Sequence, residues 1–221
     1  MNSGQSVTLA YFSSDYIVAF IKVNPIEWIR PFEASRRGGS GDQAGIPPTP
    51  AVHEFLALLR TKQDLFTQAE YFEHCKIVWH DWWTTLAFVT KCGTRLEGAR
   101  ASLQYGVRAK IYNNFYVSMI DSLHVWSMLC EAGWFDVCIL DSYSDAIGKT
   151  DLTLIKGNTR RKVGLIGPTS QAREDFEYKQ NNRDANSNLR DMVTVQLPSS
   201  RPKEPGNKRW YKLDDFRRLR L

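Results

Sequence analysis

The sequence predicts a mixed α/β (α+β) protein in which a mixed central sheet is flanked by helices. Three observations indicate this class. Apolar residues make up 43% and aromatic residues 12% of the 221 residues, which is enough to fill a core. Apolar side chains recur at helical spacing through much of residues 51–131. Short β-branched runs separated by turn residues then dominate residues 134–197.

Residues 1–110 are predicted to form an N-terminal β-hairpin followed by a helical region. β-branched and aromatic residues fill positions 7–12 and 16–23, and Ser13-Ser14-Asp15 between them supplies turn chemistry. A stretch rich in Gly, Ser and Pro at 34–50 predicts a mobile loop, after which helical spacing resumes. This part either forms its own domain or wraps around the remainder of the chain.

The aromatic run Ile77-Val78-Trp79-His80-Asp81-Trp82-Trp83 is too bulky to stay exposed. We expect it to anchor the packing of the N-terminal part, because large aromatic side chains in a helix-rich stretch are usually core residues. The alternative is that Trp79, Trp82 or Trp83 stacks on nucleic-acid bases.

Residues 111–221 are predicted to form an α/β core with a basic C-terminal tail. The amphipathic stretch 108–131 predicts a long helix that breaks near Asn113-Asn114 and ends at Gly133. Gly157-Asn158 predicts a hairpin turn, and a later helix is expected from Gln171 to about Arg183. The predicted strands cover residues 134–140, 151–155, 162–166 and 193–197.

The net charge of +5 is unevenly distributed. Residues 1–155 carry 13 Lys/Arg against 16 Asp/Glu, a net −3, whereas residues 156–221 carry 16 against 8, a net +8. Such a basic segment favours a polyphosphate partner, because each Lys or Arg that contacts a phosphate releases a bound counterion. The alternative is a solvated basic face that maintains solubility.

The candidate nucleic-acid contacts are basic residues of this segment: Lys162, Arg183, Lys208, Arg209, Lys212, Arg217 and Arg218. Within the tail, Lys208-Arg209-Trp210-Tyr211-Lys212 interleaves cations with aromatic rings, which suits a backbone with a stacked base or sugar. A C-terminal strand that packs Trp210 inward and directs its charges outward explains the same pattern equally well.

Several features favour a cytoplasmic protein with no membrane segment. No run approaches the ~18 consecutive apolar residues that a membrane helix needs. Residues 1–6 lack the basic start and apolar stretch of a signal peptide. The four cysteines, Cys75, Cys92, Cys130 and Cys138, form no C-x-x-C and sit in apolar surroundings, so we expect buried thiols rather than a disulfide framework.

Two local motifs carry a resemblance to a known family. The helix that ends in Leu129-Cys130-Glu131-Ala132-Gly133-Trp134 is followed by Gly148-Lys149-Thr150-Asp151-Leu152. Together with the order helix, strand, acidic loop, strand, turn, strand, helix, strand, these motifs resemble the PD-(D/E)XK superfamily of restriction-endonuclease-like nucleases. The resemblance covers about residues 115–200 and implies a core of that fold.

The resemblance implies a Mg²⁺ site, because phosphodiester hydrolysis needs a cation that polarises phosphate and activates water. Asp151 matches the metal-binding aspartate that opens the second core strand. Asp141 and Asp145 could support it from the preceding loop, and Asp121 or Glu131 stands for the acid of the first helix. The third strand, residues 162–166, carries no acid, so the remaining catalytic groups are assigned to the following helix: Gln171, Glu174 and Lys179.

Three hypotheses follow. The first is a Mg²⁺-dependent DNA nuclease, a hydrolase, or a nuclease-like subunit of an antiviral defence or mobile-element system, a context that only the resemblance implies. The second is a non-catalytic nucleic-acid-binding module. The third is a structural adaptor subunit whose aromatic N-terminal half binds a partner protein. A larger protein complex or a homo-oligomer is compatible with each.

Overall fold

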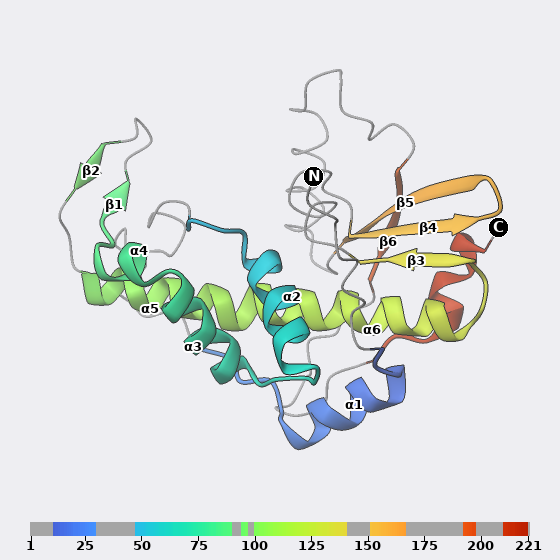
Figure 1. The fold of residues 1–221 in the computed structure, drawn as a ribbon, viewed down its shortest axis with the longest axis horizontal. Coiled ribbons are helices and arrows are strands. Elements are labelled where there is room, and N and C mark those ends of the chain that lie inside the picture. The colour runs from blue at the N-terminus through green and yellow to red at the C-terminus, as the bar shows by residue number, and fades with distance from the viewer. Residues whose placement is uncertain are drawn as a thin grey trace, which may run out of the picture. The chain divides into compact units, whose positions relative to one another are not determined.

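The structure is a computed structural model that describes residues 11–29, 47–89, 94–96, 100–140, 151–166, 192–197 and 210–220 (Figure 1). The chain divides into two compact units. Unit 1 comprises Met1–Ala10 and Ile26–Met119, and unit 2 comprises Tyr11–Pro25 and Ile120–Leu221. Unit 2 therefore combines two segments that are distant in the sequence. The boundary expected from the sequence near residue 110 stays a prediction.

Unit 1 is mainly helical. Its helices are α2 (Ala51–Lys62), α3 (Gln68–Val78), α4 (His80–Thr84), α5 (Arg100–Lys110) and the π-helix η3 (Ile111–Tyr116), with a short antiparallel pair, β1 (Phe88–Val89) and β2 (Arg95–Leu96). The π-helix occupies the position at which a break near Asn113-Asn114 was predicted. Its wider turn inserts a residue into the helical ladder and changes which side chains face the core.

Four aromatic rings form the centre of unit 1. Phe55 of α2 contacts Phe66, Tyr71 and Tyr116, with ring centroids 4.7, 5.4 and 6.0 Å away. The hydroxyl of Tyr71 donates to the carbonyl of Ala51 at 2.6 Å, and that of Tyr116 donates to Phe66 at 2.6 Å. The core therefore buries large apolar area while both phenol groups keep a hydrogen bond.

The aromatic run of residues 77–83 is only partly buried. Trp79 is 1% exposed, and its indole N–H donates to the hydroxyl of Thr49 at 2.8 Å, so the expected anchoring role is confirmed for this side chain. Ile77, by contrast, is 75% exposed. The expectation that the whole run is buried was wrong, because Ile77 and Val78, at the C-terminal end of α3, are exposed.

Two amide side chains hold an extended segment against unit 1. Gln68 accepts from the backbone N–H of Glu27 at 2.7 Å and donates to the carbonyl of the same residue at 3.1 Å. Asn113, in the π-helix, makes the equivalent pair with Ile29, at 3.0 and 2.7 Å. The segment therefore has its backbone groups satisfied without being part of a sheet.

Unit 2 combines a four-stranded mixed sheet with helices. The elements are α1 (Ser14–Val23), α6 (Val117–Glu131), β3 (Val137–Ile139), β4 (Leu152–Lys156), β5 (Thr159–Ile166), β6 (Met192–Gln196) and the 3₁₀ helix η4 (Leu213–Leu219). The strand order is β3-β4-β5-β6, with antiparallel pairs except for the parallel pair β5–β6. The mixed α/β class is confirmed, and the strands and the turn at Gly157 lie where the sequence places them.

The strand predicted over residues 16–23 was wrong, because this segment is helix α1. Ser13, predicted as a turn residue, is its N-cap, and its hydroxyl accepts from the backbone N–H of Tyr16 at 3.1 Å. Ile17 and Ile21 are the buried residues of the helix, one turn apart, so a helical period outweighs the β-propensity of the segment. Residues 7–10, the other half of the predicted hairpin, and residues 34–46 of the predicted loop lie outside the described residues.

The apolar face of the sheet packs on α6, which lies between the sheet and α1 (Figure 1). Leu152, Leu154 and Val163 alternate onto that face and are fully buried. The indole N–H of Trp126 on α6 donates to the carbonyl of Cys138 at 2.8 Å and joins the helix to β3. On the other side of α6, Glu131 accepts from the backbone N–H of Ser14 at 2.8 Å and so caps α1.

The buried thiol of Cys75 leads to a prediction about alkaline stability. Burial, reinforced by the nearby charge of Glu54, raises the pKa of this thiol from 9.0 to about 12. The unfolded chain therefore loses this proton above about pH 9 while the folded chain keeps it, so stability falls as the pH rises from about 9 to about 12. Cys75→Ala should reduce the slope of the free energy of unfolding by up to about 1.4 kcal/mol per pH unit in that window.

The measurement is urea unfolding at intervals between pH 8 and pH 10.5 for both proteins. The absolute stability of the variant is not the test, because the substitution also removes buried volume. Parallel pH profiles for the two proteins would contradict the assignment.

Candidate nucleic-acid interface

Six of the residues predicted from the sequence to form a site are described by the structure: Asp121, Asp151, Lys162, Lys212, Arg217 and Arg218. The others, Asp141, Gln171, Glu174, Lys179, Arg183, Lys208 and Arg209, lie outside the described residues. The six fall into two groups in unit 2. Asp121, Asp151 and Lys162 belong to α6 and to one end of the sheet, whereas the other three belong to η4 and the residue before it.

Asp151 lies immediately before β4 and extends its pairing with β5. Its backbone N–H donates to the carbonyl of Val163 at 3.0 Å, and its carboxylate Oδ2 accepts from the backbone N–H of Leu165 at 2.5 Å. The carboxylate thus accepts a backbone hydrogen bond that a main-chain carbonyl of a paired strand would otherwise accept.

Lys162 is the described basic residue that the ladder brings nearest to Asp151. It lies opposite Thr153, two residues along β4 from the aspartate, and it also pairs with Met192 of β6. Its side chain is partly buried, and the neighbouring Thr153 is buried. A lysine placed next to the end of β4 could stabilise negative charge that develops there.

The described part of the chain does not bring the predicted metal ligands together. Asp121 is buried on α6. Glu131, the alternative acid on this helix, hydrogen-bonds to both the backbone N–H and the hydroxyl of Ser14, so it serves as the cap of α1. Within the described ranges, no three His, Cys, Asp or Glu side chains converge so that they could hold a metal. Asp141, the remaining predicted ligand, is outside those ranges.

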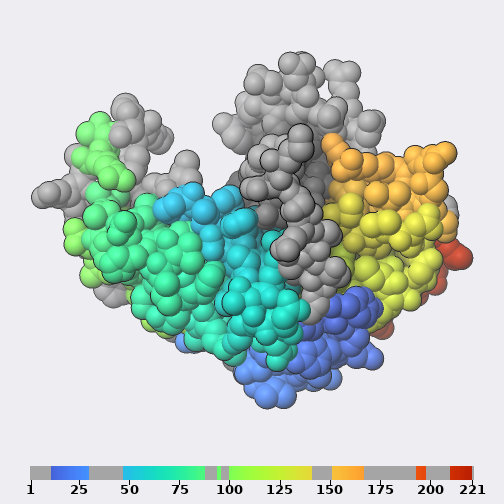
Figure 2. Space-filling view, viewed as in Figure 1, coloured from blue at the N-terminus to red at the C-terminus, as the bar shows by residue number. Residues whose placement is uncertain are grey.

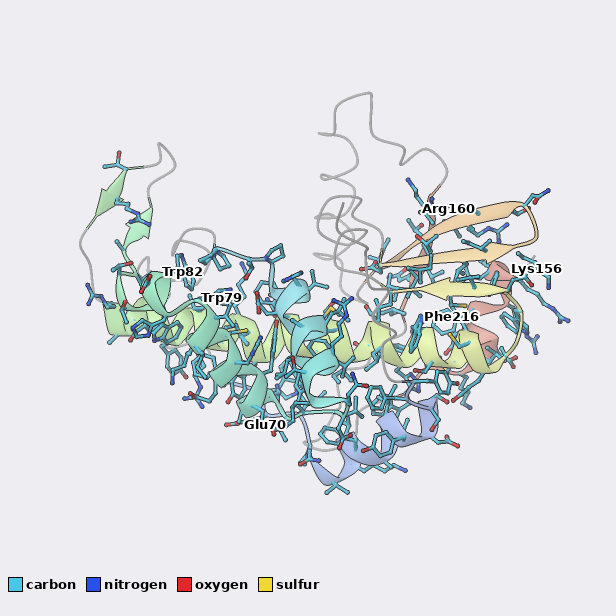
Figure 3. The ribbon with its side chains drawn as sticks, in the orientation of Figure 1. Glu70, Trp79, Trp82, Lys156, Arg160 and Phe216 are labelled. Atoms are coloured by element: carbon cyan, nitrogen blue, oxygen red, sulfur yellow. The ribbon has the colours of Figure 1, made fainter. Side chains whose placement is uncertain are left out.

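Basic side chains gather at the other end of the sheet, around the β4–β5 turn, and we call this region the basic surface. Figure 2 shows the hairpin (orange) and the C-terminal segment (red) at the surface of unit 2, and Lys156 and Arg160 flank the turn (Figure 3). The side chains of this basic surface are Lys156, Arg160, Arg161, Arg217, Arg218 and Arg220.

Two contacts join the hairpin to η4 in one surface. Arg161 of β5 donates from Nη1 to the carbonyl of Leu219 at 3.1 Å. Trp134 provides the second link, because its carbonyl accepts from Nζ of Lys156 at 2.9 Å while its ring lies under the guanidinium of Arg220, 5.8 Å from the ring centroid. Basic residues about 60 positions apart in the sequence are therefore held next to each other.

Aromatic anchors fix η4 to the rest of unit 2. Phe216 and Leu219 are fully buried, and the ring of Tyr211 meets Phe216 edge-on at 6.2 Å. Trp210 contacts the ring of His124 on α6 at 4.7 Å. The tail therefore packs its aromatic side chains against the core, and the exposed side chain of Lys212 follows them. This arrangement favours packing over base stacking for Trp210. Residues 210–212 do not form the strand that the packing alternative assumed.

The acidic side chains near the basic surface are engaged by neighbours. Asp136 accepts from the backbone N–H of Gly157 at 2.6 Å and so stabilises the hairpin turn. Asp214 pairs with Nε of Arg217 at 3.0 Å, and Asp215 accepts from the backbone N–H of Lys212 at 2.9 Å. Arg160, Arg218 and Arg220 are exposed, which leaves a net positive surface.

Three members of this surface were missed by the sequence-based selection: Lys156, Arg160 and Arg161. A signal was present, because the basic run Arg160-Arg161-Lys162 follows the predicted turn directly. In an antiparallel hairpin such a run lies next to the turn, where side chains of both faces reach solvent.

No protein-family model, no curated protein and no solved structure matches this chain. Within the part of the chain that the structure covers, none of the helices combines the length and the apolar character needed to cross a bilayer.

The link between Arg161 and η4 can be tested by hydrogen exchange. Arg161→Ala removes a charge-assisted hydrogen bond that contributes about 1.5–3 kcal/mol. Amide exchange in residues 213–219 should therefore become about 10-fold faster or more. Arg160→Ala is the matched control, because it removes the same charge from the adjacent exposed position. Equal protection of η4 in the two variants would contradict the proposed link.

Proposed function

We propose that this chain binds DNA through the basic surface of unit 2. The observation that carries the proposal is the joining of two basic segments, the hairpin and η4, by Arg161 and Trp134. A basic face that only maintains solubility does not need its cations held in fixed positions. Phosphate binding does benefit, because cations that are already positioned lose less conformational entropy on binding. Arginine, which predominates here, suits phosphate because its planar guanidinium can donate two parallel hydrogen bonds.

Binding of this kind depends on counterion release and so weakens as the salt concentration rises. We expect the triple variant Arg160→Gln, Arg218→Gln, Arg220→Gln to bind a DNA duplex more weakly at low salt. It should also reduce the slope of log K against log[salt] by up to about 2.7, because each phosphate that an arginine neutralises contributes about 0.9 to the slope. Fluorescence anisotropy at several salt concentrations measures both quantities.

The matched control replaces three other cations by glutamine: Lys22, Lys62 and Lys76. Lys62 and Lys76 already pair with Glu70 and Glu73 in unit 1, and the change in net charge is identical. If both triple variants lose affinity equally, binding reflects net charge alone and the assigned surface is wrong. If neither protein binds duplex, single-stranded DNA or RNA, the adaptor hypothesis gains support.

A second function, Mg²⁺-dependent cleavage at Asp151, is favoured by the topology of the sheet. The described elements α6, β3, β4, β5 and β6 follow one another in the order on which the resemblance to restriction-endonuclease-like nucleases rests. The parallel pairing of β5 with β6 requires a crossover connection, which usually contains a helix. The intervening residues 167–191 include the predicted Gln171, Glu174 and Lys179.

The same topology supports the proposal that Gln171, Glu174 and Lys179 lie close to Asp151. The chain leaves β5 at Ile166, close to Leu165, whose N–H the Asp151 carboxylate binds. Gln171 and Glu174 follow within eight residues of that point. In this proposal Asp151, with Asp141 or Asp121, would hold Mg²⁺, which activates a water for attack on phosphorus, and Lys179 or Lys162 would stabilise the developing charge.

The separation of the two regions fits a single duplex. Asp151 lies about 16 Å along the strand from Lys156, at about 3.3 Å per residue. That length corresponds to about five base pairs at 3.4 Å each. Arg160 and Lys162 lie on the same face of the sheet as Asp151, so a duplex along that face could contact Arg160 while a phosphate several base pairs away reaches Asp151.

Cleavage is tested with Asp151→Asn rather than with alanine. Asparagine retains an oxygen that can accept from Leu165, so the ladder is preserved while the negative charge needed for Mg²⁺ is lost. With Mg²⁺ or Mn²⁺ we expect nicking of plasmid DNA by the parent protein and a rate about 100-fold or more lower in the variant. DNA affinity should stay the same.

Asp81→Asn, at an exposed position of α4, serves as the control and should cleave like the parent. Parent protein that binds DNA but does not cleave it would leave the non-catalytic module as the function. Cleavage that survives Asp151→Asn would remove Asp151 from the site.

A further inference from the structure

Two cysteine side chains meet between the end of α6 and strand β3. Cys130 lies in the last turn of α6, and its thiol lies close enough to that of Cys138 in β3 for the two to influence each other's titration. Trp126, one turn earlier on α6, donates its indole N–H to the carbonyl of Cys138 at 2.8 Å, which holds the strand beside this face of the helix. Cys138 also pairs with Leu154, so its side chain lies on the sheet face that packs on α6.

The two thiols differ from Cys75 in accessibility. Cys130 and Cys138 are free and partly exposed, whereas Cys75 is 0% exposed in the aromatic core of unit 1. The sequence-based expectation of buried thiols is therefore confirmed for Cys75 and wrong for the pair. β3 is an edge strand of the described sheet, which agrees with the partial exposure of Cys138.

The contact also makes the two thiols unequal. The hydrogen bond from Cys138 lowers the pKa of Cys130, against the opposing effects of burial and of the charge on Glu131. The same hydrogen bond, together with burial, raises the pKa of Cys138. A thiol of lowered pKa beside a second thiol is the arrangement found where one thiol attacks a disulfide and the other resolves the product.

We propose that Cys130 and Cys138 form a redox-active dithiol, a modification site that a low-molecular-weight disulfide of the glutathione class converts into an intramolecular disulfide. In the first step the Cys130 thiolate attacks one sulfur of glutathione disulfide, a mixed disulfide forms and a glutathione thiolate leaves. Cys138 then gives up its proton and attacks the sulfur of Cys130, which expels the second glutathione. The protein dithiol loses two electrons, and glutathione disulfide gains them as two thiols.

The new bond would fix the end of α6 to the edge strand. β3 pairs with β4 over three residues, Val137–Ile139, and has no strand on its other side in the described sheet. A covalent link at Cys138 constrains the strand at its centre. Amide exchange in β3 should therefore slow on oxidation, while exchange in α3 of unit 1 should not change.

The test uses the full chain with Cys92→Ser, because Cys92 lies outside the described residues and could react by itself. The folded protein is incubated with glutathione disulfide, its intact mass is measured and the disulfide is mapped by peptide digestion. We expect loss of two hydrogens, a Cys130–Cys138 peptide pair and full reversal by dithiothreitol. Cys75 should remain a thiol until the protein is unfolded.

Two variants in the same background identify the roles. Cys138→Ser should accumulate a stable adduct of one glutathione on Cys130, because no resolving thiol remains. Cys130→Ser should react at least about 10-fold more slowly, since the nucleophile is lost. Cys138→Ala repeats the first experiment without a hydroxyl, and circular dichroism confirms that each variant is folded.

Three outcomes would overturn the proposal. The parent could end as a stable glutathione adduct with no internal disulfide, Cys130→Ser could react as fast as the parent, or the folded parent could fail to react while the unfolded chain does. None of these outcomes bears on DNA binding, so the dithiol and the proposed function stand or fall separately.

Discussion

Strand β5 is the element on which the organisation of unit 2 depends, because it is paired along both edges. Residues 159–163 pair antiparallel with β4, and residues 162–166 pair parallel with β6. One half of the strand, Thr159–Lys162, is polar and basic, and the other half, Val163–Ile166, is apolar. A single ladder thus sets the distance and the direction between the cation-rich turn and the end of the sheet where Asp151 lies.

This ladder also explains how one acidic side chain can have a structural role and still be a candidate for the proposed metal site. Asp151 precedes the first residue of β4. Its carboxylate accepts from the backbone N–H of Leu165 and so adds one hydrogen bond between this end of β4 and β5. A carboxylate in that position is held in one orientation by the backbone of the neighbouring strand. Orientation of this kind is what a metal ligand needs, and loop residues rarely have it.

Much of the sheet could be predicted from the sequence because its signals are local. Alternating β-branched residues on both sides of Gly157-Asn158 predicted the β4–β5 hairpin, and the apolar run ending at Gly133 predicted α6. Segment 16–23 failed because its β-branched residues also satisfy a helical period. In that segment the capping hydroxyl of Ser13, which resembles turn chemistry in a sequence, decides the outcome.

The basic surface and the thiol pair were harder to predict because both depend on contacts between distant segments. Nothing near Arg161 in the sequence indicates that its guanidinium meets Leu219. Cys130 and Cys138 are close in the sequence, but only the turn after α6 and the hydrogen bond from Trp126 bring β3 back along the helix. Local patterns predict elements, whereas the meeting of side chains requires tertiary geometry.

The pair of amides that holds residues 27 and 29 against unit 1 has a consequence for sequence variation. Gln68 and Asn113 bind only main-chain N–H and carbonyl groups, so they do not discriminate among the side chains at those positions. Natural variants can therefore drift freely in the identity of Glu27 and Ile29, with proline as the exception, because it has no N–H to donate. The two amides themselves, by contrast, cannot be exchanged for acids without losing a donor, and purifying selection should act on them instead.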